Sequence, residues 1–286
     1  MLWILLPAYN EEDALPTLLP KIAEVVAEKG YDFRMVVVDD GSRDATAEIL
    51  QGLTGSLPLE VVTHPINRGL GETERDGFEY VARRCAADDI IVRVESDDTH
   101  EPQYIFTLIA KLEEGFDVVN TSRFQPGGGQ MGVGAYRGAV SRAANLFMQC
   151  LFAIPGTKDY SCGFRAYRGR AIKDAVQVFG NDFVQLKGLG FTSTLEMIVK
   201  LHLLGCRFAE VPFVLRYDKK LGPSKMVSSI TSVGYLVMGL LFHWPFGGWK
   251  SQFKGLRERY QVDPEAAVEE FKHGTLARQV VSRISL

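Results

Sequence analysis

Four carboxylates lie within seven positions of the segment VRVESDDTHEP, residues 92–102. They are Glu95, Asp97, Asp98 and Glu101, and they follow an apolar stretch. Carboxylates this close repel one another unless a cation, a proton or water separates them. Two of them two positions apart at the end of a strand can reach one hard cation together. Mg²⁺ or Mn²⁺ prefers such oxygen ligands and leaves coordination places for substrate phosphates. The segment is therefore a candidate metal site, although acidic turns that bind nothing are common.

Charge is unevenly distributed along the chain. The net charge is −3, but residues 1–122 carry 10 Lys and Arg against 24 Asp and Glu. Residues 123–173 carry eight basic residues and one acidic residue, Asp159. This asymmetry suits a site where a cation and a phosphate-bearing ligand meet, although many of these charges could simply solvate helix faces. The basic segment lacks the interleaved aromatic residues of a nucleic-acid surface, so we expect no nucleic-acid partner.

The elements that must position these residues alternate between two periodicities. Short apolar runs are typical of strands buried on both faces, and they cover residues 1–6, 34–38, 59–63 and 89–94. Helical segments that begin near capping or acidic residues cover residues 13–28, 44–53 and 71–86. This order predicts βαβ units, hence an α/β fold with a mostly parallel sheet that binds ligands at its carboxyl edge.

The second half of the chain predicts further elements around a basic region. Strands are expected at residues 117–121 and 207–216, and helices at 138–152 and 193–204. The glycine-rich segment 125–134 between them is typical of a mobile lid or an acceptor loop. Four widely spaced cysteines, without metal-binding spacing, are expected to be reduced, buried thiols.

Residues 226–249 carry no charge but are interrupted by Pro245 and glycines. Their dense apolar part is about half of the ~20 residues that a membrane-spanning helix needs. Two interpretations remain open: a core or dimer helix, or an amphipathic segment lying on a membrane. We therefore expect a catalytic domain over residues 1–225, followed at 226–286 by an apolar helix and a helical tail. The apolar N-terminus lacks a basic region before it and is interpreted as a first strand, not a signal peptide.

The order of the polar motifs after these strands is specific. The chain has no GxxxxGK[ST] or GxSxG motif. Instead, PAYNE, VVVDDGS, NRGLG, the acidic pair and a later GFR turn follow one another from Met1 to about Lys225. This combination resembles the family 2 glycosyltransferases of the GT-A fold. The segments SDDTHEP, SRAANLF, DYSCGFRAYR and VP…R…GPSK are similar to those of the polyprenyl-phosphate sugar synthases, which make dolichyl-phosphate mannose or glucose.

The resemblance implies a role for particular residues. Binding of the nucleotide sugar would use Pro7, Tyr9, Glu11, Asp39 or Asp40, Gly71, Ser96, Arg216 and Lys225. The metal, Mg²⁺ or Mn²⁺, would use Glu95, Asp97 and Thr99. The acceptor phosphate would use Arg123, Arg137 and Ser141. Asp97, Arg123 and Arg137 are the expected catalytic residues. Two positions depart from the family pattern: Glu95 replaces an aspartate, and Asp98 replaces an apolar residue and is a substitute ligand in reserve.

Three functions are compatible with these motifs. The first is an inverting, metal-assisted transfer of a hexose from GDP- or UDP-sugar to a polyprenyl phosphate by a cytoplasmic protein peripheral to the membrane. An ionised phosphate acceptor needs positioning more than a base. The second is a soluble family 2 transferase acting on a small-molecule or polysaccharide hydroxyl, which needs a base. The candidate bases are Asp97, Asp98, Asp159 and Glu196, whereas His100 is expected to make only a local hydrogen bond. The third is a nucleotide-sugar-binding protein that has lost turnover.

Overall fold

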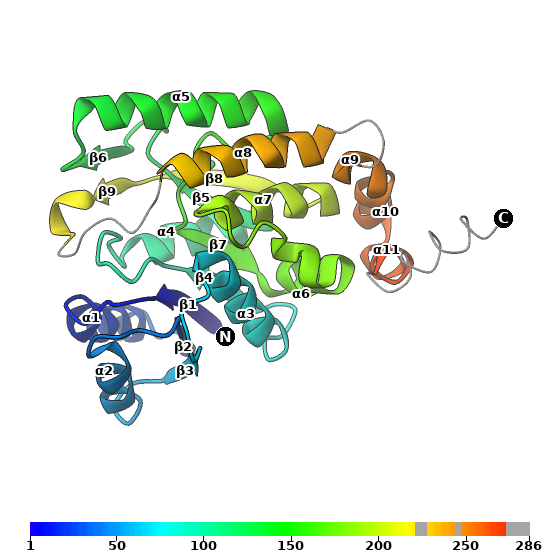
Figure 1. Cartoon of the computed structure of the whole chain (residues 1–286). Coiled ribbons are helices and arrows are strands. Elements are labelled where there is room, and N and C mark those ends of the chain that lie inside the picture. Colours follow the sequence, from blue (N-terminus) through cyan, green and yellow to red (C-terminus); the bar gives the residue numbers. More distant parts are fainter. Residues whose placement is uncertain (221–227, 244–247, 273–286) are drawn as a thin grey trace.

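The computed structural model describes residues 1–220, 228–243 and 248–272, and within them a seven-stranded sheet in the order β3-β2-β1-β4-β7-β5-β8 forms the centre of the molecule (Figure 1). The strands are β1 (Leu2–Ala8), β2 (Phe33–Asp39), β3 (Leu59–Thr63), β4 (Ile90–Arg93), β5 (Val118–Ser122), β7 (Arg165–Arg168) and β8 (Phe208–Pro212). β7 runs antiparallel to β4 and β5, and the other neighbouring pairs are parallel. The expected α/β fold with a mostly parallel sheet is confirmed.

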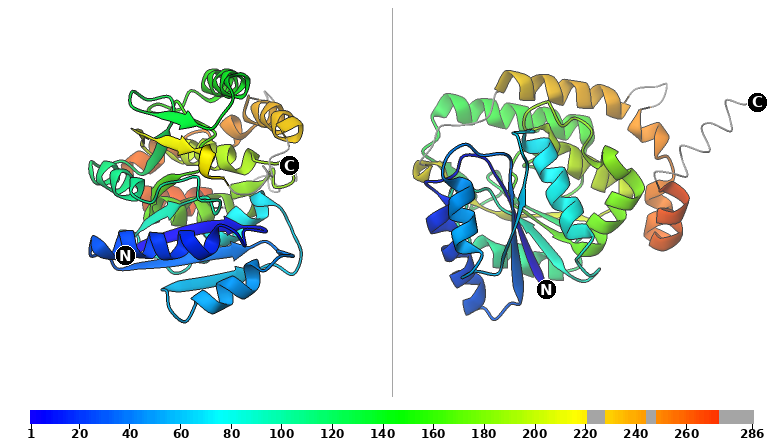
Figure 2. Two further views of the ribbon diagram at one scale, coloured as in Figure 1. Left: turned by 90° about the vertical axis from the view of Figure 1, so that its left-hand side faces the viewer. Right: turned by 60° about the horizontal axis from the view of Figure 1, so that its bottom comes forward.

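Helices cover both faces of the sheet, as the two views of Figure 2 show. The strand β1 is accordingly apolar and buried along its whole length. Leu2, Ile4 and Leu6 of β1 pack on one side, and Trp3 and Leu5 pack on the other. The first side is covered by α1 (Leu15–Glu28), α2 (Thr46–Leu53) and α4 (Tyr104–Glu113). The second side is covered by α3 (Leu70–Ala82), α5 (Ala135–Phe152), α6 (Gly169–Phe179) and α7 (Thr192–Leu204).

The prediction of one continuous strand over residues 207–216 is wrong. The chain forms β8 up to Pro212 and then β9 (Val214–Arg216), which pairs with β6 (Gly129–Met131) in a separate two-stranded sheet. Phe213 between them is fully buried, and its backbone bonds reach Ser122 and Gly129 on the two sides. The glycine-rich segment 125–134 therefore contains a short strand, which its turn-like composition does not predict.

The helix α8 (Ser228–His243) lies beside α5 along one side of the molecule (Figure 1). Met238 and Phe242 are buried in the core, whereas Leu236 and Leu240 are exposed. α8 is thus a core helix on one face only. The helices α9 (Trp249–Gln252), α10 (Leu256–Val262) and α11 (Pro264–Phe271) add side chains to the core that α6 and α7 share. Among the described residues, no helix combines the length and apolarity needed to cross a membrane.

Three of the four cysteines are buried free thiols, but Cys150 on α5 is exposed, so the expectation that all four are buried is wrong for this one. Cys150 is close to the end of a helix whose outer face is open to solvent. Local sequence does not reveal which face of such an apolar helix is covered.

The buried His202 makes the fold sensitive to acid. Burial and the neighbouring Arg257 lower the pKa of His202 to about 4. The unfolded chain therefore binds more protons between pH 6.5 and 4, and the free energy of unfolding falls as the pH falls through this window. We expect His202→Gln to lessen the loss of stability between pH 7 and 4.5 by about 2 kcal/mol. Urea titrations at both pH values measure this. A loss of stability as large in His202→Gln as in the wild type would contradict this expectation.

Candidate active site

A cavity of about 350 Å³ opens at the carboxyl edge of the sheet. Its walls come from the residues that follow β1, β4 and β5, from the turn before β7, and from α5 and α8. The site residues expected from the sequence that line it are Pro7, Glu11, Glu95, Ser96, Asp97, Thr99, Arg123, Arg137 and Ser141. The fold thus brings the acidic turn and the basic segment, which are separate in the sequence, into one cavity.

Five other expected residues do not line this cavity as the described residues define it: Tyr9, Asp39, Asp40, Gly71 and Arg216. Lys225 lies outside the described residues. Asp39 is buried and accepts a hydrogen bond from the backbone of Ser42. Arg216 forms a bidentate pair with Asp218, at 2.9 Å from Nε and 2.8 Å from Nη2. The roles expected for these residues in binding the donor stay predictions.

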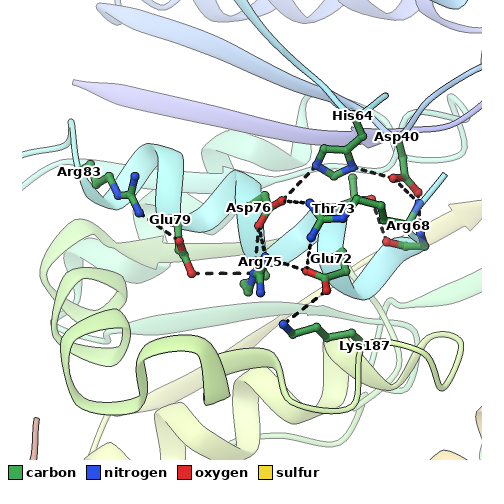
Figure 3. A network of polar contacts seen from close by, with 11 residues as sticks. Asp40, His64, Arg68, Glu72, Thr73, Arg75, Asp76, Glu79, Arg83 and Lys187 are labelled. Atoms are coloured by element: carbon green, nitrogen blue, oxygen red, sulfur yellow. Dashed lines mark hydrogen bonds and ion pairs between the residues drawn. The ribbon is translucent and has the colours of Figure 1, made fainter. Parts of the chain in front are cut away.

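Asp40 is the anchor of a polar network around α3 (Figure 3). Its Oδ1 lies 2.7 Å from His64 Nδ1 and accepts the backbone N–H of Arg68 at 2.8 Å, and its Oδ2 accepts the N–H of Gly69 at 2.8 Å. The carboxylate therefore holds the NRG turn in place. Gly71 has a packing role nearby, because a Cβ there would lie 2.6 Å from the Cα of Lys187.

Asp97 projects into the cavity as an ionised carboxylate. Its Oδ1 accepts a 2.6 Å hydrogen bond from the hydroxyl of Thr99, and its Oδ2 contacts the Nζ of Lys220. Burial opposes ionisation, but the ammonium of Lys220 outweighs it and holds the pKa of Asp97 below its usual range. The charge of Asp97 is thus maintained by a residue that follows it by 123 positions.

Glu95 is turned toward a buried arginine. Arg93, which is 1% exposed on β4, contacts Glu95 through Nη1 and Glu74 of α3 through Nη2 at 3.0 Å. Burial disfavours the guanidinium charge, but these two carboxylates raise the pKa of Arg93. The ionic pairing explains how a glutamate is accommodated at this position, because its side chain spans the distance to Arg93.

His100 makes the local hydrogen bond expected for it. Its Nδ1 lies 3.3 Å from the backbone N of Glu95, and its ring stacks on Phe164 with the centroids 5.0 Å apart. Burial lowers the pKa of His100 to about 4, so the ring is neutral at pH 7.

Gly163 leaves room for the Arg93 pairs. A Cβ at this position would lie 2.1 Å from Arg93 Nη1 and 2.7 Å from Glu95 Oε1. We expect Gly163→Ala to push the guanidinium away from its carboxylates and to lower the free energy of unfolding by about 1–3 kcal/mol. Chemical denaturation measures the change. Gly188→Ala is the matched control, because a Cβ there meets nothing within 4 Å. Equal stability of the two variants would contradict the expectation.

Arg123 lines the cavity and is held there by Asp159 and Ser161. Its Nε and Nη2 donate to Asp159 at 2.7 and 2.8 Å, and Nη2 also donates to the hydroxyl of Ser161 at 2.7 Å. Asp159 is fully buried; burial opposes its ionisation, but Arg123 keeps its pKa low. Arg137 lies on α5 with its guanidinium over the ring of Tyr217, 5.2 Å from the centroid. Arg137 and Ser141 lie one turn apart on α5, and both line the cavity together with Arg123.

The four candidate bases are placed very differently. Asp98 contacts Lys21 at 3.4 Å, and Asp159 forms an ion pair with Arg123. Glu196 is buried in α7, where its carboxylate accepts the backbone N–H groups of Gln185 and Leu186. Of these four described residues, Asp97 is the one that lines the cavity, and its carboxylate is occupied by Lys220 and Thr99.

Sequence reasoning missed Lys220 and one wall of the cavity. Lys220 follows Arg216 in a basic run, which was the available signal. Thr231, Ser232 and Tyr235 of α8 line the cavity, and burial raises the pKa of Tyr235 to about 12. Their spacing on one helical face is a weak signal, because the apolar character of α8 dominates its sequence.

The donor atoms near Asp97 fit a hard divalent cation. Within the described residues no three His, Cys, Asp or Glu side chains converge as a metal cage. Mg²⁺ is commonly held by one or two carboxylates together with substrate phosphates and water, so such a cage is not required. The carboxylate of Asp97 and the hydroxyl of Thr99 would supply oxygen ligands, and the ammonium group of Lys220 against Asp97 shows that this position accommodates a positive charge.

The strand order, with antiparallel β7 and an acidic turn after β4, defines a GT-A fold of the nucleotide-sugar transferase class. The chain belongs to glycosyl transferase family 2, whose sequence profile matches residues 3–175. An undecaprenyl-phosphate mannosyltransferase from Micrococcus luteus is 30% identical over 256 residues, which cover 89% of this chain and 97% of that protein.

Two further similarities are partial or distant. An undecaprenyl-phosphate 4-deoxy-4-formamido-L-arabinose transferase from Pseudomonas fluorescens is 36% identical over 175 residues, 60% of this chain, and the match spans about half (48%) of that relative. Among solved structures, glucosyl-3-phosphoglycerate synthase from Mycobacterium tuberculosis, in complex with Mn²⁺, UDP and phosphoglyceric acid, has a TM-score of 0.58. It is 18% identical, with 84% of this chain and 77% of that chain covered, and it supports the fold alone.

Proposed function

We propose that the protein transfers a hexose from a nucleoside diphosphate sugar to a polyprenyl phosphate, with inversion at the anomeric carbon. The observation that carries this proposal is the meeting, in one cavity, of the ionised Asp97 with the two arginines Arg123 and Arg137. A negatively charged turn suits a cation and a diphosphate, and the arginines suit a second phosphate. The similarity to the mannosyltransferase of M. luteus supports the acceptor class.

The donor side of the cavity is the acidic turn. Asp97 and Thr99 would hold Mg²⁺ or Mn²⁺, and Glu95 is expected to bind through water or to position the turn. The ion would supply charge neutralisation for the leaving diphosphate. Pro7, Glu11 and Ser96 line the same side, and the Ser96 hydroxyl donates to the carbonyl of Pro7 at 2.8 Å. They support placement of the nucleotide there.

The acceptor side favours an anion over a hydroxyl. A hydroxyl acceptor needs a base, yet three of the four candidate carboxylates do not line the cavity and Asp97 is paired with Lys220. A phosphate oxygen is already ionised at neutral pH and needs only orientation and charge balance. Arg123 and Arg137 would orient this oxygen toward the anomeric carbon. The new bond then forms as the bond from that carbon to the diphosphate oxygen breaks on the opposite face, which inverts the configuration.

The outer faces of α5 and α8 support a peripheral position on the cytoplasmic face of a membrane. They carry exposed apolar side chains: Tyr136, Val140, Leu146, Phe147, Ile230, Val233, Leu236 and Leu240. Both helices lack acidic residues, and α5 carries Arg137 and Arg142. Apolar side chains with basic residues beside them suit an anionic lipid surface. The same two helices line the cavity, so an acceptor phosphate could enter it from the bilayer.

Vesicle binding tests this surface. We expect the double substitution Leu236→Glu and Leu240→Glu to weaken cosedimentation with phosphatidylglycerol vesicles by at least about 10-fold, because two apolar contacts are replaced by charges. Ile66→Glu is the control, since Ile66 is exposed but lies outside α5 and α8. Unchanged vesicle binding by the double variant would instead favour a protein partner for this face.

Transfer of labelled sugar tests the function itself. The protein is incubated with radiolabelled GDP- and UDP-hexoses, Mg²⁺ or Mn²⁺, and undecaprenyl phosphate. We expect label in the organic-extractable lipid and release of the nucleoside diphosphate. If label stays in the aqueous phase but enters a sugar or glycan, the soluble transferase is favoured. If a donor binds without transfer or hydrolysis under any of these conditions, the protein is a binding protein.

A further inference from the structure

The carboxylate of Asp97, which is expected to hold the metal, is already paired with a positively charged side chain of the protein itself. The Nζ of Lys220 contacts Asp97 Oδ2 inside the cavity, and both side chains are largely buried, at 13% and 19% exposure. Lys220 follows the short helix η2 (Tyr217–Lys219) and lies 5.8 Å from the centroid of the Tyr217 ring. No motif in the sequence assigns Lys220 a role.

A divalent ion and an ammonium cannot share this carboxylate without strong repulsion in a partly buried site. Binding of the metal to Asp97 therefore requires Lys220 to leave. A displaced ammonium in this cavity needs another anion, because an unpaired buried charge is costly. The diphosphate of the donor is the anion that arrives at this side of the cavity.

We propose that Lys220 is an internal counter-cation that keeps Asp97 paired until the donor arrives, and then transfers to the donor diphosphate. Lys220 thereby couples the two binding events, so that the metal binds weakly alone and more tightly with the nucleotide. The identity of the donor rests on the proposed function. The contact between Lys220 and Asp97 does not.

Lys219 is a matched neighbour with a different partner. Its Nζ contacts Glu101, which also pairs with Lys21 at 3.0 Å, and neither Lys219 nor Glu101 lines the cavity as the described residues define it. Lys219→Met removes the same charge from the next position along the chain. It therefore controls for any general effect of net charge on cation binding.

Binding of Mn²⁺ alone tests the first half of the proposal. Free Mn²⁺ is followed by electron paramagnetic resonance in titrations without nucleotide. We expect Lys220→Met to bind Mn²⁺ at least about 10-fold more tightly than the wild type, and Lys219→Met to match the wild type. Adding Asp97→Asn to Lys220→Met should abolish the gain. Equal affinity of the wild type and Lys220→Met, or a gain that persists without the Asp97 carboxylate, would overturn the proposal.

Calorimetry with UDP and with GDP tests the second half. Nucleotide affinity is measured in EDTA and in saturating Mn²⁺, and the ratio gives the coupling between the two ligands. We expect Lys220→Met to bind nucleotide more weakly under both conditions and to have a lower coupling ratio, whereas Lys219→Met changes neither. An unchanged ratio in Lys220→Met would contradict the proposal. These measurements involve no acceptor, so failure of sugar transfer to lipid would leave the coupling standing, and the reverse also holds.

Discussion

Asp97→Asn is expected to lower sugar transfer by about 10³-fold. The substitution keeps the shape of the side chain and removes the charge that lines the cavity. If Asp97 holds the metal against the leaving diphosphate, its charge contributes several kcal/mol to the transition state, and about 4 kcal/mol corresponds to this loss. The loss should appear in kcat at saturating donor, measured as labelled lipid formed per unit time.

Asp98→Asn is the matched control for this prediction. Asp98 is the adjacent carboxylate, but it pairs with Lys21 and has a backbone φ of 53°, which asparagine tolerates well. We expect its transfer rate to stay within a few-fold of the wild type. A loss as large as that of Asp97→Asn would indicate that Asp98, the reserve ligand suggested by the sequence, also binds the ion. It would contradict the assignment of the metal to Asp97, which rests on the residues that line the cavity.

Arg123→Met is expected to lower transfer and to destabilise the fold at the same time. Asp159 is fully buried, and removal of its guanidinium partner leaves an unpaired charge that costs about 3–5 kcal/mol. The same guanidinium is expected to orient the acceptor phosphate, so transfer should fall by about 10²–10³-fold. Loss of activity in this variant alone could therefore arise from either cause.

The double variant Arg123→Met with Asp159→Asn separates the two causes. Neutralising Asp159 removes the unpaired charge, and the free energy of unfolding should recover most of its loss. Transfer should stay low if Arg123 acts on the acceptor. Both quantities are measured, by urea denaturation and by the lipid-extraction assay. Recovery of transfer together with stability would make Arg123 a structural residue whose partner is Asp159.

The strands and the edge of the sheet that carries the site follow from local patterns. The apolar runs that became β1, β2 and β4 are largely buried on both faces, whereas β3, at the edge of the sheet, is half-buried. The parallel pairing of β1 with β4 places the ends of these two strands at the same edge. Residues that follow those ends, such as Glu11 and Asp97, line the cavity. Features that depend on chain exchange between sheets were missed. The division of residues 207–216 into β8 and β9 depends on the pairing of β9 with β6. Local periodicity does not predict which strands pair.

The sequence by itself determined that this chain has an acidic turn and a basic segment, because residue types and their spacing are local properties. Which charges meet was decided by the tertiary structure. Glu95 is paired with Arg93, which also contacts Glu74 of α3. Asp98 is paired with Lys21, and Asp97 is paired with Lys220. The partners of Asp98 and Asp97 are 77 and 123 positions away. Electrostatic pairing depends on distance in space and on burial, so four similar carboxylates acquire different roles only once the chain has folded.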